Sequence, residues 1–574
     1  MLSKPGPGRI NWLGRIDGVN SQRGRRTNIA RRLSDARLMP LARGCVAFTL
    51  CIGVVSLVVT LLHLPRLAGA ALWSADAVAP SVLAESFWRD GLFGQRTLLG
   101  DITSLWDVAT FTALEPLPFH RQLWLLVPYA TSLVTAAFFA AAVARASRTR
   151  LAGFATFAML ISVATVVQFS QIAPAYRGSS WLLMGVFAYL AVRTVDAPET
   201  VPFVLRSTVG RVVLGIVAAI LIASDPLTIL FAVIPITLVL QDRRRHLRAG
   251  ETADTSHFQA VVIAALIGAV ALLASLAKAG ISSSGNRSTS RVLTIASREA
   301  MLQHLEQIWR NLLAILGVAK GANTPSNAIG WVPVAVFIVL VGLLVRFLAD
   351  SHWRSRLDRS LRALTIYVTA GVGLLLPAYV VSTAPVPTVT GAENARYLVP
   401  LWIGLAVLLP AYWARARSGA QQLAAAVAMA ILVVPGAVAI ANSEIIHERE
   451  RGTLAAEHEN IADYLRARGA TEGLSGYWDA NPLRFRSGLH VVAVRLCKTA
   501  RHFCPVRLNA RASWYEGFRQ TQTFVIVKKP ATSGFTEQRA IRVFGTQPTE
   551  RRSFGRITVL IFPMPASQYV DPLE

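Results

Sequence analysis

Residues 45–64 read CVAFTLCIGVVSLVVTLLHL. Twenty residues in a helix extend about 30 Å, which is the thickness of the hydrocarbon core of a bilayer. The segment contains no Asp, Glu, Lys or Arg, so it is predicted to cross a membrane. Residues 1–43 before it form a basic arm with seven arginines between positions 23 and 43. Because basic segments stay in the cytoplasm, the arm is expected inside. The first run is too long for a removable signal peptide.

The composition extends this interpretation to most of the chain. Of 574 residues, 53% are hydrophobic and only 16% are charged, whereas about a quarter of residues are charged in soluble domains. The net charge of +26 comes from arginines gathered in short segments between apolar runs. This distribution indicates membrane topology, and without a recognition motif beside it we expect no nucleic-acid partner.

The apolar runs predict a mainly α-helical, polytopic bundle at residues 44–441 with about eleven spans, the N-terminus inside and the C-terminus outside. Every dense arginine cluster between spans then falls on the cytoplasmic side. Residues 65–121 and 278–330 become large external loops. The spans expected after the first are 123–144, 151–169, 180–192, two arms within 212–240, 257–277, 331–348, 364–381, 397–413 and 423–441.

The two arms within residues 212–240 follow from the charges around them. A single helix of this length would measure roughly 43 Å, and Ser224-Asp225-Pro226 interrupts it near the middle. Proline breaks or kinks a helix. A hairpin with Asp225 at its outer turn places the basic residues at 206–211 and 243–248 on the same side, so we expect a hairpin.

The external loop 278–330 contains an amphipathic pattern of its own. After Ser297, apolar residues recur at helical spacing: Leu302, Leu305, Ile308, Trp309, Leu312 and Leu316. Two placements fit this apolar stripe. The helix lies in the plane of the membrane interface, or it packs on the outer ends of the bundle.

Residues 442–574 are expected to form a small extracytoplasmic α/β or α+β domain. A helix should end near Gly469, and strands are expected at 490–496, 523–527, 540–544 and 557–562. Cys497 and Cys504 would form a disulfide if this domain is outside the cytoplasm. The aromatic residues Tyr477, Trp478, Trp514 and Tyr515 either stack on a sugar or fill the core.

Four ionisable residues lie on the expected outer face, where charges are costly to keep and are candidates for function. Asp76 follows the first span, Arg177 lies in an outer loop, Asp225 is in the hairpin turn, and Arg396 precedes Tyr397 at a helix start. A carboxylate can act as general base toward a hydroxyl, and arginine can bind phosphate. The structural alternatives are that Asp76 caps the following helix, that Asp225 caps the broken one, and that Arg177 contacts lipid headgroups.

This arrangement resembles the GT-C superfamily of membrane glycosyltransferases. The likeness covers roughly residues 44–574 and rests on the many spans, the acid in a large first external loop, the Arg396-Tyr397-x-x-Pro400 segment and the external C-terminal domain. The segment Gly473-Leu-Ser-Gly476-Tyr-Trp478-Asp-Ala-Asn481 also looks like the external domains that end some bacterial members. The resemblance implies a polyprenyl-phosphate-linked sugar as donor and an acceptor glycan, lipid or protein at the outer face of the bacterial inner membrane. Asp76 would be the catalytic base, and Arg396 would contact the carrier phosphate. In this interpretation Arg177 assists Arg396, and Asp225 supports the site or orients the acceptor.

Many GT-C members carry paired acids in the first loop, whereas Asp76 is well separated from Glu85 and Asp90. The use of a divalent metal therefore stays open, and the histidines show no metal-ligand spacing. Two other function classes remain as alternatives. One is a transporter or flippase for a lipid-linked or anionic solute, and the other is a non-catalytic membrane protein with an external binding domain. No sequence fits the ATP-binding pattern Gly-x-x-x-x-Gly-Lys-Ser/Thr, so an ATP-driven pump is not expected.

Overall fold

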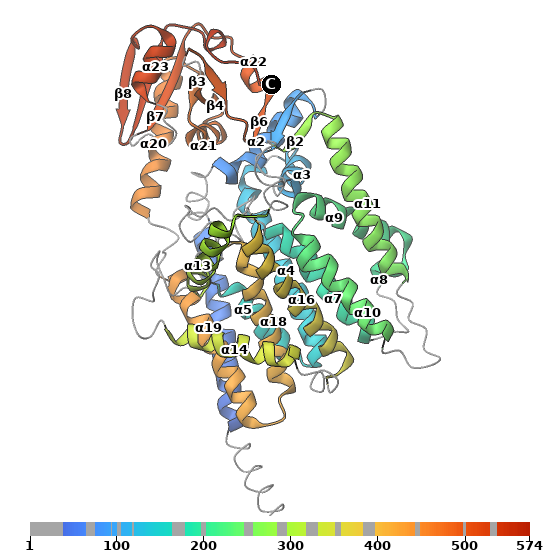
Figure 1. The fold of residues 1–574 in the computed structure, drawn as a ribbon. Helices are drawn as coiled ribbons and strands as arrows, with labels where there is room; N and C mark the ends of the chain where they lie inside the picture. The colour runs from blue at the N-terminus through green and yellow to red at the C-terminus, as the bar shows by residue number, and fades with distance from the viewer. Residues whose placement is uncertain are drawn as a thin grey trace, which may run out of the picture.

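The computed structural model combines a helical bundle with a sheet-containing C-terminal domain at one end (Figure 1). It describes residues 38–64, 75–92, 95–99, 105–117, 120–163, 178–196, 203–245, 256–283, 295–316, 331–349, 357–382, 396–441, 448–497, 501–528 and 536–573. All structural statements below concern these residues. Most of the basic N-terminal arm, at residues 1–37, lies outside them.

The bundle begins with the helix Leu38–Leu64. It continues with α4 (His120–Ser147), α5 (Arg150–Ile161), α7 (Gly178–Asp196), α8 (Phe203–Arg206), α9 (Thr208–Ser224), η2 (Ile229–Val233), α10 (Ile234–Arg245), α11 (Ser256–Lys278), α13 (Arg298–Ile315), α14 (Trp331–Ala349), α16 (Arg359–Val381), η4 (Arg396–Leu398), α18 (Val399–Arg415) and α19 (Gly419–Ala441).

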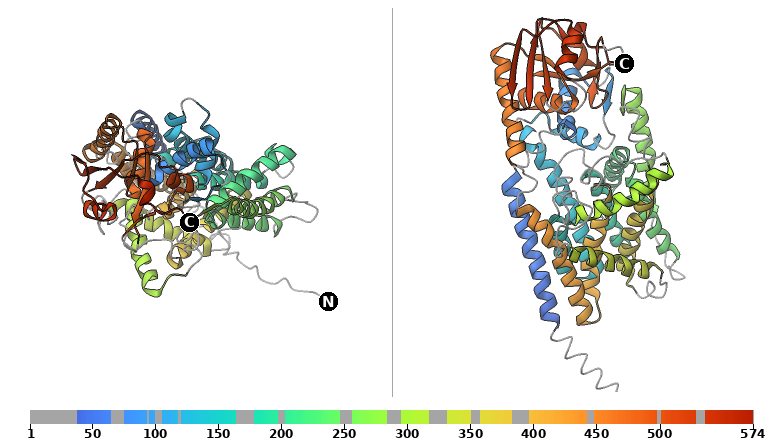
Figure 2. Two further views of the ribbon diagram at one scale, coloured as in Figure 1. Left: turned by 90° about the horizontal axis from the view of Figure 1, so that it is seen from above. Right: turned by 60° about the vertical axis from the view of Figure 1, so that its left-hand side comes forward.

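Six helices in the described part of the chain are long and apolar enough to cross a membrane: Leu38–Leu64, Leu126–Ser147, His257–Lys278, Arg359–Val381, Arg396–Arg415 and Gly419–Gly436. The chain is therefore expected to be a membrane protein, but the count of eleven spans is not confirmed. The expected span 151–169 coincides with α5, which ends at Ile161 and reaches only about 18 Å. The expected span 331–348 coincides with α14, which lies across the bundle (Figures 1 and 2).

Small residues allow the bundle helices to pack closely around α5. A Cβ at Gly53 would lie 2.5 Å from the Ala158 Cβ, and a Cβ at Gly153 would lie 2.7 Å from the Ala140 carbonyl oxygen. Both contacts exclude any larger residue without a shift. Helices that meet in lipid rely on such close approach, because burial from water does not drive their association.

Charged residues gather where several bundle helices begin or end. Arg145 of α4 lies 2.8 Å from Asp196 of α7, and Arg362 of α16 lies 2.6 Å from Asp242 of α10. Arg415 at the end of α18 forms an ion pair with Asp358 at the start of α16. These pairs place the ends of α4, α7, α10 and α18 beside the start of α16, as expected for basic segments that share one side of the bundle.

The segment around Asp225 is a broken helix with both basic ends near the start of α11. Arg211 of α9 lies 2.6 Å from His257 Nδ1, and Arg244 of α10 donates to Gln259 Oε1 at 2.6 Å. The two arms therefore return to the same element, as the hairpin interpretation requires. The turn between them passes through the π-helical segment η2.

The first loop contributes α2 (Ala75–Asp90), β1 (Thr97–Leu99) and α3 (Leu105–Leu114), and β2 (Ile281–Ser283) follows α11. The C-terminal domain contains α20 (Glu448–Ala467), β3 (Glu472–Ser475), α21 (Tyr477–Ser487), β4 (His490–Leu496), β5 (Phe503–Pro505), β6 (Ala510–Arg511), α22 (Ala512–Glu516), β7 (Thr523–Lys528), α23 (Glu537–Phe544), β8 (Glu550–Phe554), β9 (Ile557–Phe562) and η5 (Ala566–Gln568).

The sheet of the C-terminal domain has the order β5-β4-β3-β7-β9-β8, in which β4, β3 and β7 are parallel and the outer pairs are antiparallel. Strands β4, β7 and β9 match the predicted strands. The predicted strand at 540–544 is wrong, because it lies in helix α23. Thr536 caps this helix by accepting from the Arg539 amide, and Gly545 ends it in the left-handed conformation.

The first loop and the C-terminal domain share one core. Val78, Val82 and Phe87 of α2 pack in the same buried cluster as Leu474 of β3 and Trp514 of α22. Strand β1 also pairs with β2 on one side and with β6 on the other. Helix α2, which begins at Ala75, is therefore held against the C-terminal domain.

Candidate functional site

Asp76 lies in the first turn of α2 and is half-buried. Helix α2 begins at Ala75, so Asp76 lies within the helix rather than at the capping position before it. The positive end of the helix dipole favours a carboxylate in this turn. Asp76 also meets the C-terminal domain here: the Tyr477 hydroxyl donates a hydrogen bond to Asp76 Oδ1, and Asn509 Nδ2 donates to the Tyr477 hydroxyl at 2.8 Å.

The position of Tyr477 follows from the strand order. The chain leaves β3 at Ser475 and enters α21 at Tyr477, which leads to β4 on one side of β3, whereas β7 lies on the other side. The chain therefore leaves β3 in the direction away from β7. Ligands of open α/β sheets bind at the carboxyl ends of the strands at such a point. Asp76 therefore faces the part of this sheet where a ligand site is expected.

Four aromatic residues were considered from the sequence as a surface for stacking on a sugar, and the ring of one of them is exposed. Trp514 and Tyr515 are buried in the core, so they cannot stack on a sugar. The Tyr477 ring is also buried and uses its hydroxyl on Asp76. Trp478 is 40% exposed, and its ring lies 5.3 Å from the Tyr477 ring. Trp478 is the member of the four that offers an exposed ring, next to the Tyr477 ring.

Farther along the same interface, α21 places a buried arginine against α2. Arg484 Nη2 donates to Ser86 Oγ at 3.4 Å, and its guanidinium lies 4.2 Å from the centre of the Trp514 ring. The Trp514 indole N–H also donates to Ser86 Oγ, at 2.9 Å. Burial lowers the pKa of Arg484 to about 10, with a contribution from Arg89, while Glu85 acts in the opposite direction. No local sequence pattern marks this arginine.

Arg511 makes a second polar link between the domain and the end of α2. Its guanidinium donates to Gln95 Oε1 at 3.2 Å and to the carbonyl of Gly91. Ser513 Oγ donates to Asp90 Oδ2 at 3.1 Å. Burial would raise the pKa of Asp90, but Arg89, Ser513 and Arg511 outweigh it and lower the pKa. These contacts fix the end of α2 opposite to Asp76.

Arg396 and Tyr397 form the start of the short helix η4, which leads into α18. The Arg396 guanidinium lies 5.3 Å from the centre of the Tyr397 ring, and this ring lies 6.3 Å from that of Tyr379 in α16. The contacts of this turn are with α16 and α13, whereas those of Asp76 are with the C-terminal domain. Arg177 lies outside the described residues.

Asp225 is buried at the break between α9 and η2. Its Oδ1 accepts a hydrogen bond from the Leu227 amide at 3.1 Å, and its carbonyl accepts from the Thr228 hydroxyl at 2.6 Å. The Asp225 side chain thus accepts a hydrogen bond from a backbone amide at the break around Pro226. This is the capping role named above as the structural alternative. This contact does not bring Asp225 to Asp76.

A buried charged cluster between α20, α21 and the end of β7 was not anticipated. Lys528 Nζ at the end of β7 lies 3.6 Å from Asp479 Oδ1 of α21, and His458 Nε2 of α20 lies 4.0 Å from the same oxygen. Burial lowers the pKa of His458 to about 4, with contributions from Arg486 and Lys528. Burial raises the pKa of Asp479. His458 is therefore uncharged in the folded protein at neutral pH.

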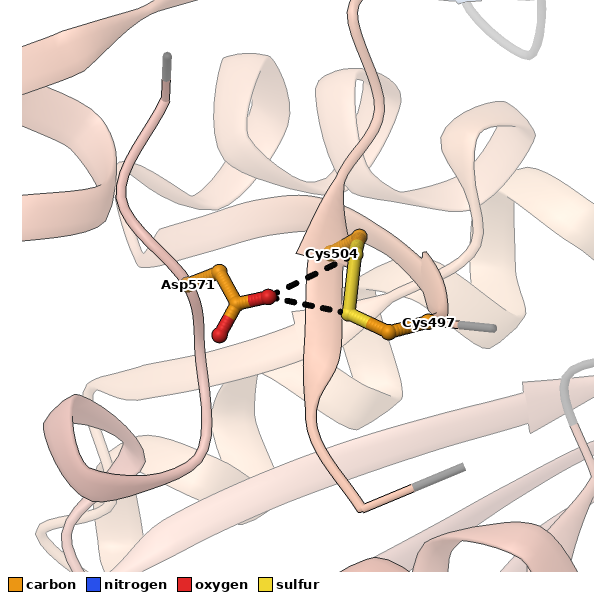
Figure 3. Close-up of side chains that lie close together, drawn as sticks. All are labelled: Cys497, Cys504 and Asp571. Atoms are coloured by element: carbon orange, nitrogen blue, oxygen red, sulfur yellow. Dashed lines mark hydrogen bonds between the residues drawn. A yellow bond between two sulfur atoms is a disulfide. The ribbon is translucent and has the colours of Figure 1, made fainter. Parts of the chain in front are cut away.

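Cys497 and Cys504 form a disulfide, with 5.1 Å between their Cα atoms. Asp571 lies beside it, with Oδ2 at 3.1 Å from Cys497 Sγ and 3.5 Å from Cys504 Sγ (Figure 3). His502 Nδ1 lies 2.9 Å from Asp571 Oδ1. In the described residues, these two cysteines and Asp571 are the group whose donor atoms are close enough for a metal ion. The disulfide removes the thiolates that a metal would need.

No protein-family model matches the chain, and neither a curated protein nor a solved structure was found to match it. The function is therefore inferred from the fold and from the contacts of the side chains.

Proposed function

We propose that this protein is a membrane glycosyltransferase of the GT-C type, which moves a sugar from a polyprenyl-phosphate donor to an acceptor on the outer face of the cytoplasmic membrane. The observation that supports it most is the place of Asp76. Its carboxylate is half-buried at the start of α2 and is held by Tyr477, at the carboxyl ends of the parallel strands of the external domain.

In the proposed reaction, Asp76 takes the proton from an acceptor hydroxyl as general base. The hydroxyl oxygen forms a bond to the anomeric carbon of the donor sugar. The bond between this carbon and the phosphate oxygen breaks, and polyprenyl phosphate leaves with the bonding electrons. A fixed carboxylate saves part of the entropic cost of orienting the base. The Tyr477 hydroxyl supplies this fixation through its hydrogen bond to Asp76 Oδ1.

The leaving phosphate needs a cation, and Arg396 is the residue proposed for it. A planar guanidinium binds phosphate through paired hydrogen bonds. Arg396 lies just before α18, with its guanidinium 5.3 Å from the centre of the Tyr397 ring. Tyr397 and Arg177 are proposed to assist, and Trp478 offers a ring face for the acceptor sugar. In this proposal Asp225 has a structural role and does not act on the substrate, because its side chain binds the Leu227 amide.

The experiment is a mass-spectrometric profile of surface glycans and polyprenyl-linked sugars in cells that lack the protein. These cells are complemented with the wild type, with Asp76→Asn or with Asp225→Asn as a matched control at another buried acid. The proposal predicts that a sugar is missing and its lipid-linked donor accumulates, and that wild type and Asp225→Asn restore the profile. A profile restored by Asp76→Asn would remove Asp76 from the mechanism.

A further inference from the structure

Helix α13 buries polar side chains and exposes leucines, the reverse of a helix on a soluble protein. His304, Gln307 and Asn311 recur at helical spacing and are buried. Leu302, two residues before His304, and Leu305, the residue after it, are 59% and 52% exposed. The apolar stripe predicted from the sequence therefore exists, but its N-terminal half does not face the bundle.

The buried polar row is bound to α16. Asn311 Nδ2 donates to the Tyr379 hydroxyl at 2.8 Å, and this hydroxyl lies 3.4 Å from Gln307 Oε1, to which it donates. His304 Nδ1 lies 2.9 Å from the Val380 carbonyl oxygen. The Ala296 amide, just before the helix, donates to the Val381 carbonyl at 2.7 Å. Each buried polar side chain of the row thus has a partner, which fixes the rotation of α13 about its axis.

With this rotation, the outer surface of α13 divides into two stripes. At about 100° per residue, Leu302, Leu305 and Trp309 fall on one stripe, on which the two leucines are exposed and Trp309 is half-buried. Gln303, Glu306 and Arg310 fall on another, where Glu306 and Arg310 form an ion pair. The outer surface of α13 thus has an apolar stripe and a charged stripe, and its polar row packs on α16. A helix of this kind is suited to the boundary between lipid and water.

The apolar stripe is continuous with other exposed apolar residues of the bundle. The Trp309 ring lies 6.2 Å from the ring of Trp331 at the start of α14. Trp331 and Val332 are exposed, and so is Val381 at the end of α16, whose carbonyl is bound to the segment before α13. Tryptophan is enriched where the acyl region meets the headgroups. These neighbours indicate lipid, rather than water or a protein partner, as the surroundings of the stripe.

We propose that α13 lies in the boundary between acyl chains and headgroups of the leaflet on the side of the C-terminal domain. Leu302, Leu305 and Trp309 contact lipid, Glu306 and Arg310 face water, and the polar row packs on α16 beside the Arg396–Tyr397 turn. This placement concerns bilayer lipid, so it does not depend on the proposed sugar transfer.

The test uses single cysteines at positions 302, 305, 303 and 306 of the full chain, in a background with Cys45→Ala and Cys51→Ala and with the disulfide kept intact. Each cysteine carries an environment-sensitive fluorophore, and the protein is reconstituted in phosphatidylcholine vesicles. Brominated acyl chains quench probes in lipid, and iodide on both sides of the membrane quenches probes in water. Positions 303 and 306 are matched controls, because they are one residue from the leucines on the same helix.

Brominated lipid should quench most of the fluorescence at positions 302 and 305 and little at positions 303 and 306, with the opposite pattern for iodide. Equal quenching of all four probes by iodide would show that α13 lies in water. Protection of positions 302 and 305 from both quenchers would show that protein covers the stripe. Either result overturns the proposal.

Discussion

The hydroxyl of Tyr477 donates a hydrogen bond to the carboxylate of Asp76, although 401 positions separate the two residues in the chain. Asn509 donates to the same hydroxyl at 2.8 Å and so leaves its proton for Asp76. The contact joins the first loop to the C-terminal domain at the carboxyl ends of its parallel strands. It makes Tyr477 a positioning residue for the proposed base.

Tyr477→Phe should therefore lower the turnover of the proposed transfer more than it lowers stability. The substitution keeps the ring and removes two hydrogen bonds, the one to the Asp76 carboxylate and the one from Asn509. A hydrogen bond to a charged group contributes about 1.5–3 kcal/mol to folding, and a neutral one contributes about 1 kcal/mol. Tyr515→Phe is the matched control, because this buried hydroxyl in the same domain donates to the Ala493 carbonyl at 2.8 Å. The kcat of each purified variant should be compared beside its melting temperature. An equal loss of kcat in both variants would contradict a specific role for Tyr477.

His458 should make the protein less stable as the pH falls. Its pKa is about 4 in the folded protein against 6.5 for the free side chain. Between these values the unfolded chain binds a proton that the folded protein does not, so stability is lost from about pH 6.5 down to pH 4. The full loss is about 3 kcal/mol. Burial raises the pKa of Asp479 and Glu457, and this opposes the loss because their neutral forms are favoured on acidification.

The contribution of His458 is isolated by comparing wild type with His458→Gln in thermal unfolding from pH 8 to pH 4.5. The variant should lose less stability than wild type over this range, while Lys528, Arg486, Asp479 and Glu457 remain in place. His502→Gln is the control at an exposed histidine. If wild type and His458→Gln show the same pH dependence, His458 binds its proton as readily in the folded protein as in the unfolded chain, and the account of its burial is wrong.

Asp225→Ala should destabilise the bundle by about 1–2 kcal/mol, because it leaves the Leu227 amide without its acceptor in a buried turn. Asp225→Asn keeps a side-chain oxygen there and should cost less. Both variants should keep the activity of wild type per folded molecule. A stable Asp225→Asn protein without activity would return Asp225 to the acceptor-orienting part considered from the sequence.

The disulfide predicts how many cysteine thiols of the protein react with a maleimide. Without reductant, the denatured protein should react with two equivalents of a maleimide, at Cys45 and Cys51, and with four after reduction. Replacing Cys497 and Cys504 by serine should lower stability by about 2–3 kcal/mol, the value expected for closing a short loop. Four reactive thiols in protein prepared without reductant would contradict an extracytoplasmic C-terminal domain.

The parts of the fold that depend on local composition could be predicted from the sequence. The helices α16, α18 and α19 coincide with apolar runs, because length and hydropathy decide whether a helix suits lipid. Strands β4, β7 and β9 were found because each is a short apolar run bounded by turn residues. Helix α23 was misread because its apolar residues are too few to distinguish the two periods, although Thr536 and Gly545 were capping signals.

The parts that depend on distant contacts could not be predicted. Asp76 was singled out by its place after a span, but its bond to Tyr477 has no local pattern. The same holds for Arg484, which looks like a surface residue in sequence and is buried against Ser86. The orientation of α13 was ambiguous for a related reason. Its apolar stripe fitted both the membrane interface and the ends of the bundle, and only the partners of Asn311 and Gln307 on Tyr379 decide which row is inside.

The most direct test of the central claim is transfer by purified protein in vesicles that contain the polyprenyl-linked sugars extracted from cells lacking the protein. The release of polyprenyl phosphate and the mass of the glycosylated acceptor are measured by mass spectrometry. Wild type should release polyprenyl phosphate and form the product, and Asp76→Asn should do neither while it unfolds at the same temperature. Full transfer by Asp76→Asn would contradict the account.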